Sequence, residues 1–94
     1  MSHTLIIKLS KDHISLHVTN CPKTFRLFME KGKLTVLKFE REKLLDKNKI
    51  SLSGLGVSTI DELLKALEKK PEYYYSKITG ENTVIDELLI VEEV

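Results

Sequence analysis

The sequence of 94 residues has no tryptophan and no glutamine, one cysteine and two prolines. The single Cys21 excludes a disulfide within the chain. A reactive thiol would also need an activating neighbour, and the residues around Cys21 supply none. We therefore interpret Cys21 as an inert residue in a turn. A free cysteine is compatible with a reducing compartment, and we expect a cytoplasmic protein.

Long apolar runs are missing as well. No stretch approaches the roughly 20 apolar residues that a membrane-spanning helix needs. The N-terminal segment has neither the basic region nor the apolar length of a secretory signal, so we expect no membrane partner. The hydrophobic fraction of 41% and the charged fraction of 31% are typical of one globular domain, which we place at residues 1–94.

Catalytic and cofactor motifs are also lacking. The chain contains no P-loop, no G-x-G-x-x-G, no C-x-x-C and no H-E-x-x-H. His13 and His17 lie on one predicted strand about 13 Å apart, too far to share a metal ion. We therefore expect no cofactor, no metal site and no catalytic residue. An enzyme is the least favoured alternative, and His13, Ser15 and His17 would then be the residues to test.

What the chain does contain is a period-two alternation of apolar residues, which predicts β-strands in its first half. Four strands are expected, at residues 4–10, 13–19, 24–29 and 34–39. The last of these is apolar on both faces near its middle, which favours an interior place in the sheet. We expect the highly charged residues 41–49 to be a mobile loop or one helical turn, and residues 49–53 to be a short fifth strand.

One amphipathic helix is predicted after residue 58. Ser58 or Thr59 can cap it, leucines recur at helical spacing, and Pro71 ends it. The aromatic segment 72–78 favours a strand. Residues 84–94 fit either a helix or a strand, and we favour a final strand from about Leu88. Together these elements predict an α+β fold, an antiparallel sheet of about five to six strands with one amphipathic helix packed on one face.

Charge is divided unevenly along the chain, although the net charge is only +1. Residues 1–57 contain eleven Lys and Arg against five Asp and Glu, whereas residues 58–94 contain four against nine. Such asymmetry indicates nucleic-acid contact or head-to-tail association, or else a solvated surface without a partner. The high lysine and glutamate content is typical of thermophilic proteins, and an AT-rich genome produces a similar bias.

Two functional hypotheses follow. The leading one is a small non-enzymatic binding protein that acts as a homodimer, because so many strands with one helix leave a face or an edge uncovered. The alternative is a single-stranded nucleic-acid-binding protein that uses the basic N-terminal half of the sheet, with aromatic residues such as Phe28 and Phe39 as stacking surfaces. Its candidate binding residues are Lys8, Arg26, Lys33, Lys38 and Arg41.

Overall fold

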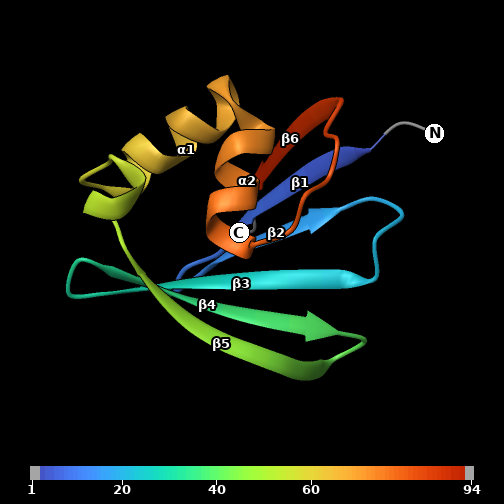
Figure 1. The fold of residues 1–94 in the computed structure, drawn as a ribbon, viewed down its shortest axis with the longest axis horizontal. Coiled ribbons are helices and arrows are strands. Elements are labelled where there is room, and N and C mark those ends of the chain that lie inside the picture. Colours follow the sequence, from blue (N-terminus) through green and yellow to red (C-terminus); the bar gives the residue numbers. More distant parts are fainter. Residues whose placement is uncertain (1–2, 93–94) are drawn as a thin grey trace.

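The structure, a computed structural model, describes residues 3–92 and contains one six-stranded sheet with two α-helices (Figure 1). The strands are β1 (Thr4–Leu9), β2 (Ile14–Val18), β3 (Lys23–Glu30), β4 (Lys33–Glu40), β5 (Lys43–Ser51) and β6 (Glu87–Glu92). A 3₁₀ turn (Ser53–Leu55) leads from β5 to α1 (Ile60–Lys69) and α2 (Pro71–Thr79). The strands lie in the order β5-β4-β3-β2-β1-β6.

The predicted α+β class is confirmed, but the sheet is mixed and not purely antiparallel. Neighbouring strands from β1 to β5 are antiparallel, whereas β6 lies parallel to β1, with Leu5 opposite Leu88 and Ile7 opposite Ile90. The parallel pair arises because the chain crosses over through both helices before it returns to the sheet. The final strand expected from about Leu88 is confirmed over Glu87–Glu92, and residues 93–94 of that prediction lie outside the described residues.

The prediction of a single helix was wrong, because the aromatic segment expected to be a strand forms α2. Pro71 occupies the first turn, where its missing N–H costs nothing, and Gly80 ends the helix with φ 76°. Tyr75 and Ile78 are three residues apart and are both buried. This helical spacing places them on one side of α2, against the core, and that packing outweighs the strand preference of aromatic residues.

The prediction of a loop or one helical turn at residues 41–49 was also wrong, since most of this charged segment belongs to β5. Lys43 pairs with Glu40 and Ile50 pairs with Leu34, so β5 forms a long hairpin with β4. Residues 43–49 are all exposed. An edge strand can be polar on both sides because its backbone pairing comes from the neighbouring strand.

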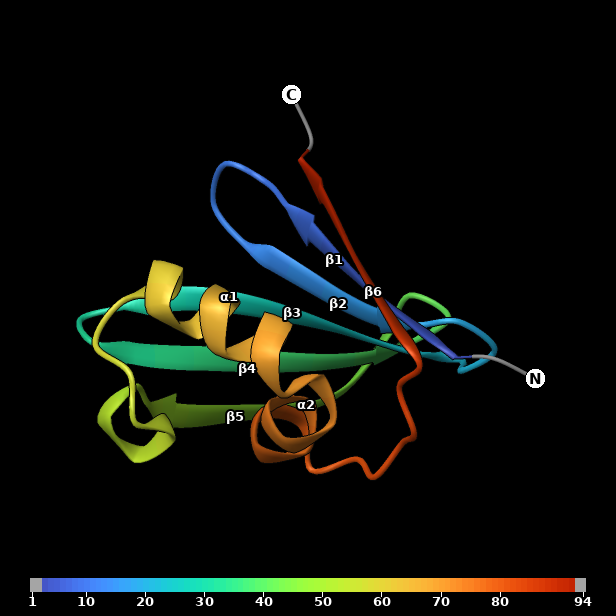
Figure 2. The ribbon, with the colours of Figure 1, turned by 90° about the horizontal axis from the view of Figure 1, so that it is seen from above.

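One face of the sheet packs against both helices (Figures 1 and 2). Alternate strand residues on this covered face are buried, and so are the helix residues that contact them. The core includes Leu5, Ile7, Leu16, Phe25, Leu27, Leu34 and Val36 from the sheet, and Leu63, Leu67, Tyr75 and Ile78 from the helices. Each such side chain contributes about 1.5–3 kcal/mol by leaving water.

The start of α1 agrees with its sequence pattern. The Glu62 N–H donates to Thr59 Oγ1 at 3.2 Å, and the Glu62 carboxylate accepts from the Ser58 N–H at 2.7 Å. The first bond satisfies a backbone donor that the first helical turn leaves without a partner, and the second binds the residue that precedes the cap. Neither helix in residues 3–92 has the length and apolar content needed to cross a bilayer.

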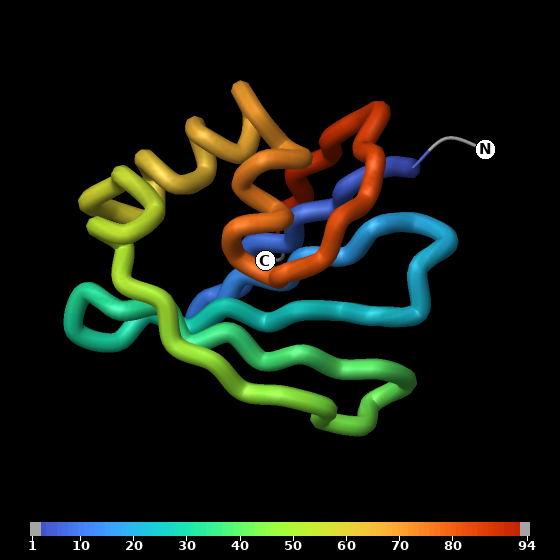
Figure 3. The backbone as a smooth tube through the Cα atoms, viewed as in Figure 1, coloured from blue at the N-terminus to red at the C-terminus, as the bar shows by residue number. Residues whose placement is uncertain are grey.

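A connection over residues 80–86 leads from α2 to β6 (Figure 3). Glu81 fastens this connection to the sheet, since its Oε1 lies 2.9 Å from Lys23 Nζ and 3.0 Å from Lys38 Nζ. At the far end, the Asp86 N–H donates to the His3 carbonyl and the His3 N–H donates to the Asp86 carboxylate. These contacts position β6 beside β1.

Candidate nucleic-acid interface

No helix or strand of residues 3–92 lies over the other face of the sheet, which we call the open face. Strand alternation assigns its residues, because neighbouring side chains point to opposite faces. Its charged strand residues are Lys8, Arg26, Glu30, Lys33, Lys47, Lys49 and Glu87. Its apolar and aromatic residues are Ile6, Phe28, Leu37, Phe39, Leu44, Leu89 and Val91.

The charge of the open face is mainly positive. Its two acidic strand residues lie at its margins, Glu30 at the end of β3 and Glu87 at the start of β6. One row of directly paired residues crosses β1 to β5 and holds three cations without an acid: Lys8, Ser15, Arg26, Leu37 and Lys47. Five adjacent strands span about 19 Å, so this row forms an elongated basic band.

Aromatic rings lie next to this band and are stacked with cationic or heteroaromatic groups. The Arg26 guanidinium carbon lies 4.8 Å from the centre of the Phe39 ring. His13 and Phe28 stack with ring centres 5.3 Å apart and planes 28° from parallel. Arg26 and Phe39 meet because they are diagonal neighbours on β3 and β4. The open face therefore offers flat surfaces as well as positive charge.

A depression of about 540 Å³ lies at the end of the open face where the β2–β3 connection and the β4–β5 turn meet. Its lining residues are His17, Cys21, Pro22, Thr24, Arg26, Phe39, Arg41 and Glu42. The chain has thirteen lysines and two arginines, and both arginines line this depression. Arginine binds phosphate through a planar fork of N–H donors, which lysine lacks.

The β4–β5 turn that forms one side of the depression has an unfavourable backbone. Arg41 has φ 50° and Glu42 has φ 69°, so two consecutive residues with full side chains are left-handed. This conformation costs roughly 1–2 kcal/mol per residue for L-amino acids. Strained residues of this kind often occur at binding sites. In this backbone conformation Arg41 lines the depression.

The structure brings four of the five residues predicted to bind nucleic acid to this side of the molecule. Lys8, Arg26 and Lys33 lie on the open face, and Arg41 lines the depression at its end. Lys38 lies on the covered face instead, where it pairs with Glu81. It is therefore part of the contact that fastens the connection to β6.

The Glu81 contact changes the ionisation of its members. Hydrogen bonds from Lys23 and then Lys38 lower the pKa of Glu81 below its ordinary value. The same bond to Glu81 raises the pKa of Lys23. Glu81 and Lys23 are therefore charged at neutral pH, and their contact with each other and with Lys38 stabilises the fold without contributing to the open face.

Two cations of the open face, Lys47 and Lys49, were not among the predicted binding residues. Lys47 was missed because residues 41–49 were expected to be a loop or one helical turn, in which a residue has no assigned face. Lys49 was missed because the short strand expected over residues 49–53 had no predicted partner. The alternate positions of Lys47 and Lys49, next to the strand expected over residues 49–53, were the signal that could have revealed a longer strand. Their pairing with Leu37 and Thr35 places Lys47 in the basic band and Lys49 beside it.

The histidines form separate hydrogen bonds and do not converge. His13 Nδ1 lies 2.8 Å from Asp12 Oδ1, and this hydrogen bond lowers the pKa of Asp12. His17 Nε2 lies 3.2 Å from the Cys21 carbonyl oxygen. Within residues 3–92, no group of three or more His, Cys, Asp or Glu is arranged to hold a metal ion.

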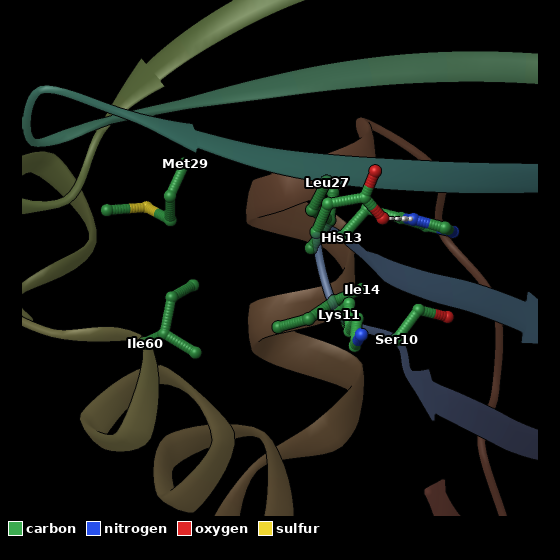
Figure 4. A pocket seen from close by; sticks show the side chains of 8 residues that line it. Ser10, Lys11, His13, Ile14, Leu27, Met29 and Ile60 are labelled. Atoms are coloured by element: carbon green, nitrogen blue, oxygen red, sulfur yellow. Dashed lines mark hydrogen bonds and ion pairs between the residues drawn. The ribbon is translucent and has the colours of Figure 1, made fainter. Parts of the chain in front are cut away.

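A second hollow of about 200 Å³ lies between the β1–β2 turn and the start of α1. Figure 4 shows Met29 and Ile60 on one side of it, with Leu27 and Ile14 across from them. Ser10, Lys11, Asp12 and His13 complete the lining. Because Ile14 and Leu27 belong to the core and Ile60 packs against it, we interpret the hollow as a packing gap at the end of the covered face.

The open face thus combines cations in a band, accessible rings and an arginine-lined depression. Cations along a groove or band follow a phosphate backbone, and flat rings stack with bases. No protein-family model, curated protein or solved structure matches this chain, so its function is inferred from this geometry alone.

Proposed function

We propose that this protein is a non-enzymatic binding protein whose open face binds single-stranded nucleic acid. The observation that carries the proposal is the basic band of Lys8, Arg26 and Lys47 next to the Arg26–Phe39 stack. A single strand exposes both its phosphates and its unpaired bases, and this surface offers partners for both. The proposal places the protein inside the cell.

A sheet surface without a projecting helix suits a single strand better than a duplex. Reading a duplex requires an element that enters a groove, usually a helix or a two-stranded ribbon. Both helices here are held on the covered face by buried residues such as Leu67 and Tyr75. The bases of a duplex are also stacked on each other, so they are not free to stack on Phe39 or on Arg26.

The charge of the open face also argues against a homodimer that packs face to face. In a two-fold dimer the same patch meets itself. Lys8, Arg26 and Lys47 would then face a second set of the same cations without intervening acids. We therefore assign a polyanion to this face, and we look for contacts between copies elsewhere on the molecule.

The proposal is tested by fluorescence anisotropy of a labelled single-stranded oligonucleotide at several salt concentrations. Three to five phosphate contacts predict that log affinity falls with log salt with a slope of about −2 to −4. The variant Lys8→Glu/Arg26→Glu should bind at least about tenfold more weakly, because it removes two phosphate contacts and adds two repulsions.

The matched control is Lys65→Glu/Lys69→Glu, which changes the net charge equally on the exposed side of α1. It should bind nearly as well as the wild type. An equal loss of oligonucleotide affinity in both variants would show that the protein attracts the oligonucleotide through its overall charge and not through the open face. Absence of salt-sensitive binding by the wild type would reject the proposal.

A further inference from the structure

The two outer strands of the sheet carry opposite charges. Within residues 3–92, β5 and β6 each have one neighbouring strand, so each has a free edge. On β5, Lys43, Lys47 and Lys49 outnumber Asp46. β6 begins with Glu87, ends with Glu92 and contains no basic residue. The charge of the β5 edge is therefore complementary to that of the β6 edge, whereas two copies of the same edge would repel each other.

The two edges also differ in how they are protected against pairing. Natural edge strands commonly carry lysines, prolines or bulges that discourage the addition of another strand. β5 has three lysines, and its register with β4 shifts at Lys38/Phe39. β6 has four consecutive apolar residues, Leu88 to Val91, between its two glutamates. It has no lysine or proline and no register shift against β1.

We propose that copies of this chain associate edge to edge, with β6 of one copy beside β5 of the next. Pairing of β6 with a second β6 in antiparallel fashion would bring Glu87 opposite Glu92, and pairing of two β5 strands would bring lysines together. Like charges directly opposite each other destabilise strand pairs. A β6–β5 contact instead joins acidic to basic residues, so the lysines that repel a second β5 attract β6, and we assign a second copy to the β6 edge.

The strand directions allow this pairing to continue the sheet. Four antiparallel steps from β1 to β5 leave β5 running in the same direction as β1, and β6 is parallel to β1. A parallel β6–β5 pair between copies therefore keeps every open face on the same side. Because the two surfaces in contact differ, the arrangement does not close at two copies and can extend.

A row of side chains on the open face supports the same arrangement. Its successive paired members are Leu89, Ile6, His17, Thr24, Phe39 and Leu44. The row ends in a leucine at each edge, and Leu44 and Leu89 are each 51% exposed. When β6 of one copy lies beside β5 of the next, these leucines can cover each other.

The association does not require nucleic acid and is tested without it, so its failure would leave the proposed function intact. Sedimentation velocity at low salt should show mass rising with concentration past the dimer, and added salt should reverse the rise. The variants Glu87→Lys/Glu92→Lys and Lys47→Glu/Lys49→Glu should each sediment as monomers, because their two edges then carry the same charge sign. An equimolar mixture of the two variants should assemble again, because each reversed edge meets a complementary one.

Thermal melts of both variants check that they remain folded. Leu44→Ser is a milder variant at a half-exposed site, and it should weaken assembly while keeping the wild-type melt. Lys65→Glu/Lys69→Glu is the matched control and should assemble like the wild type. A wild type that stays monomeric at all concentrations, a mass that stops at the dimer, or a mixture that does not assemble would each overturn the proposal.

Discussion

The two faces of the sheet are built from alternate residues of the same strands, yet they have different roles. On the covered face Phe25 is 1% exposed and meets the ring of Tyr75 edge-on, with ring centres 5.9 Å apart. On the open face Phe39 is half-buried and lies under an arginine. Because one step along a strand changes the face, neighbouring residues can serve stability and binding separately.

The largest expected effect comes from the two phenylalanines. Phe25→Ala removes a fully buried ring and should lower the free energy of unfolding by about 3–5 kcal/mol. Phe39→Ala should lower the free energy of unfolding much less, because its ring is already partly solvated. It should weaken oligonucleotide binding instead, by about 1–3 kcal/mol if a base stacks there.

Urea denaturation monitored by circular dichroism measures the first effect, and anisotropy measures the second. The comparison fails if Phe39→Ala is as destabilising as Phe25→Ala, since the open face would then be covered in solution. Unchanged binding by a folded Phe39→Ala variant would remove this ring from the interface.

The strained β4–β5 turn gives the next largest effect. Replacing Arg41-Glu42 with Asn-Gly supplies the residues that accept a left-handed backbone at both positions. The protein should become more stable by roughly 1–2 kcal/mol. Oligonucleotide affinity should fall several-fold, because Arg41 no longer lines the depression. The single variant Glu42→Gly is the control, since it relieves strain and keeps Arg41. A binding loss equal to that of the double variant would contradict the role of Arg41.

The Glu81 contact should make the free energy of unfolding depend on pH. We expect a change of about 1 kcal/mol, because Glu81 is partly exposed and accepts hydrogen bonds from two cations. The folded pKa of Glu81 lies below its ordinary value of 4.5, so the unfolded chain takes up the proton more readily. The stabilisation is therefore complete above that value and is lost as pH falls through the lowered folded pKa.

Thermal melts from neutral to acidic pH should show this loss in the wild type and less of it in Glu81→Gln. Glu68→Gln, at an exposed position on α1, serves as the comparison and should follow the wild type. Parallel curves for all three proteins would show that Glu81 does not fasten the connection to β6.

The smallest effect concerns two lysines on opposite faces of β4. Lys33→Met should reduce the salt dependence of binding by about one phosphate contact and leave the melting temperature almost unchanged. Lys38→Met should lower the melting temperature and leave the salt dependence of binding almost unchanged, because it removes a partner of Glu81 without altering the open face. The same result for both lysines in both assays would contradict the face assignments.

Much of the sheet could be predicted because its pattern is local. Alternation in β1 to β4, the Gly32 turn and the capping residues of α1 each appear within a few neighbouring residues. β5 was missed because its turn uses Arg41-Glu42, without the Asn or Gly that usually marks a two-residue hairpin. α2 was missed because three tyrosines favour a strand, and only packing of Tyr75 on Phe25 shows the helical face.

The candidate interface was less predictable than the fold. Sequence alone identified a basic half, but the face of each lysine depends on strand register. Lys33 and Lys38 lie on one strand with an odd spacing of five, so alternation places them on opposite faces once that strand is known. The convergence of Arg26 and Arg41 on one depression depends on long-range pairing and could not be read from spacing.

The pairing of β1 with β6 has a consequence for synthesis of the chain. Leu5 and Leu88 are adjacent in the sheet but 83 residues apart in sequence. On the ribosome β1 emerges long before its partner, and closing so large a loop is slow compared with forming a hairpin. Until β6 arrives, the edge of β1 beside Leu5 and Ile7 is open to other nascent chains. Arrival of this last strand therefore sets the time at which the newborn protein is no longer prone to aggregate through β1.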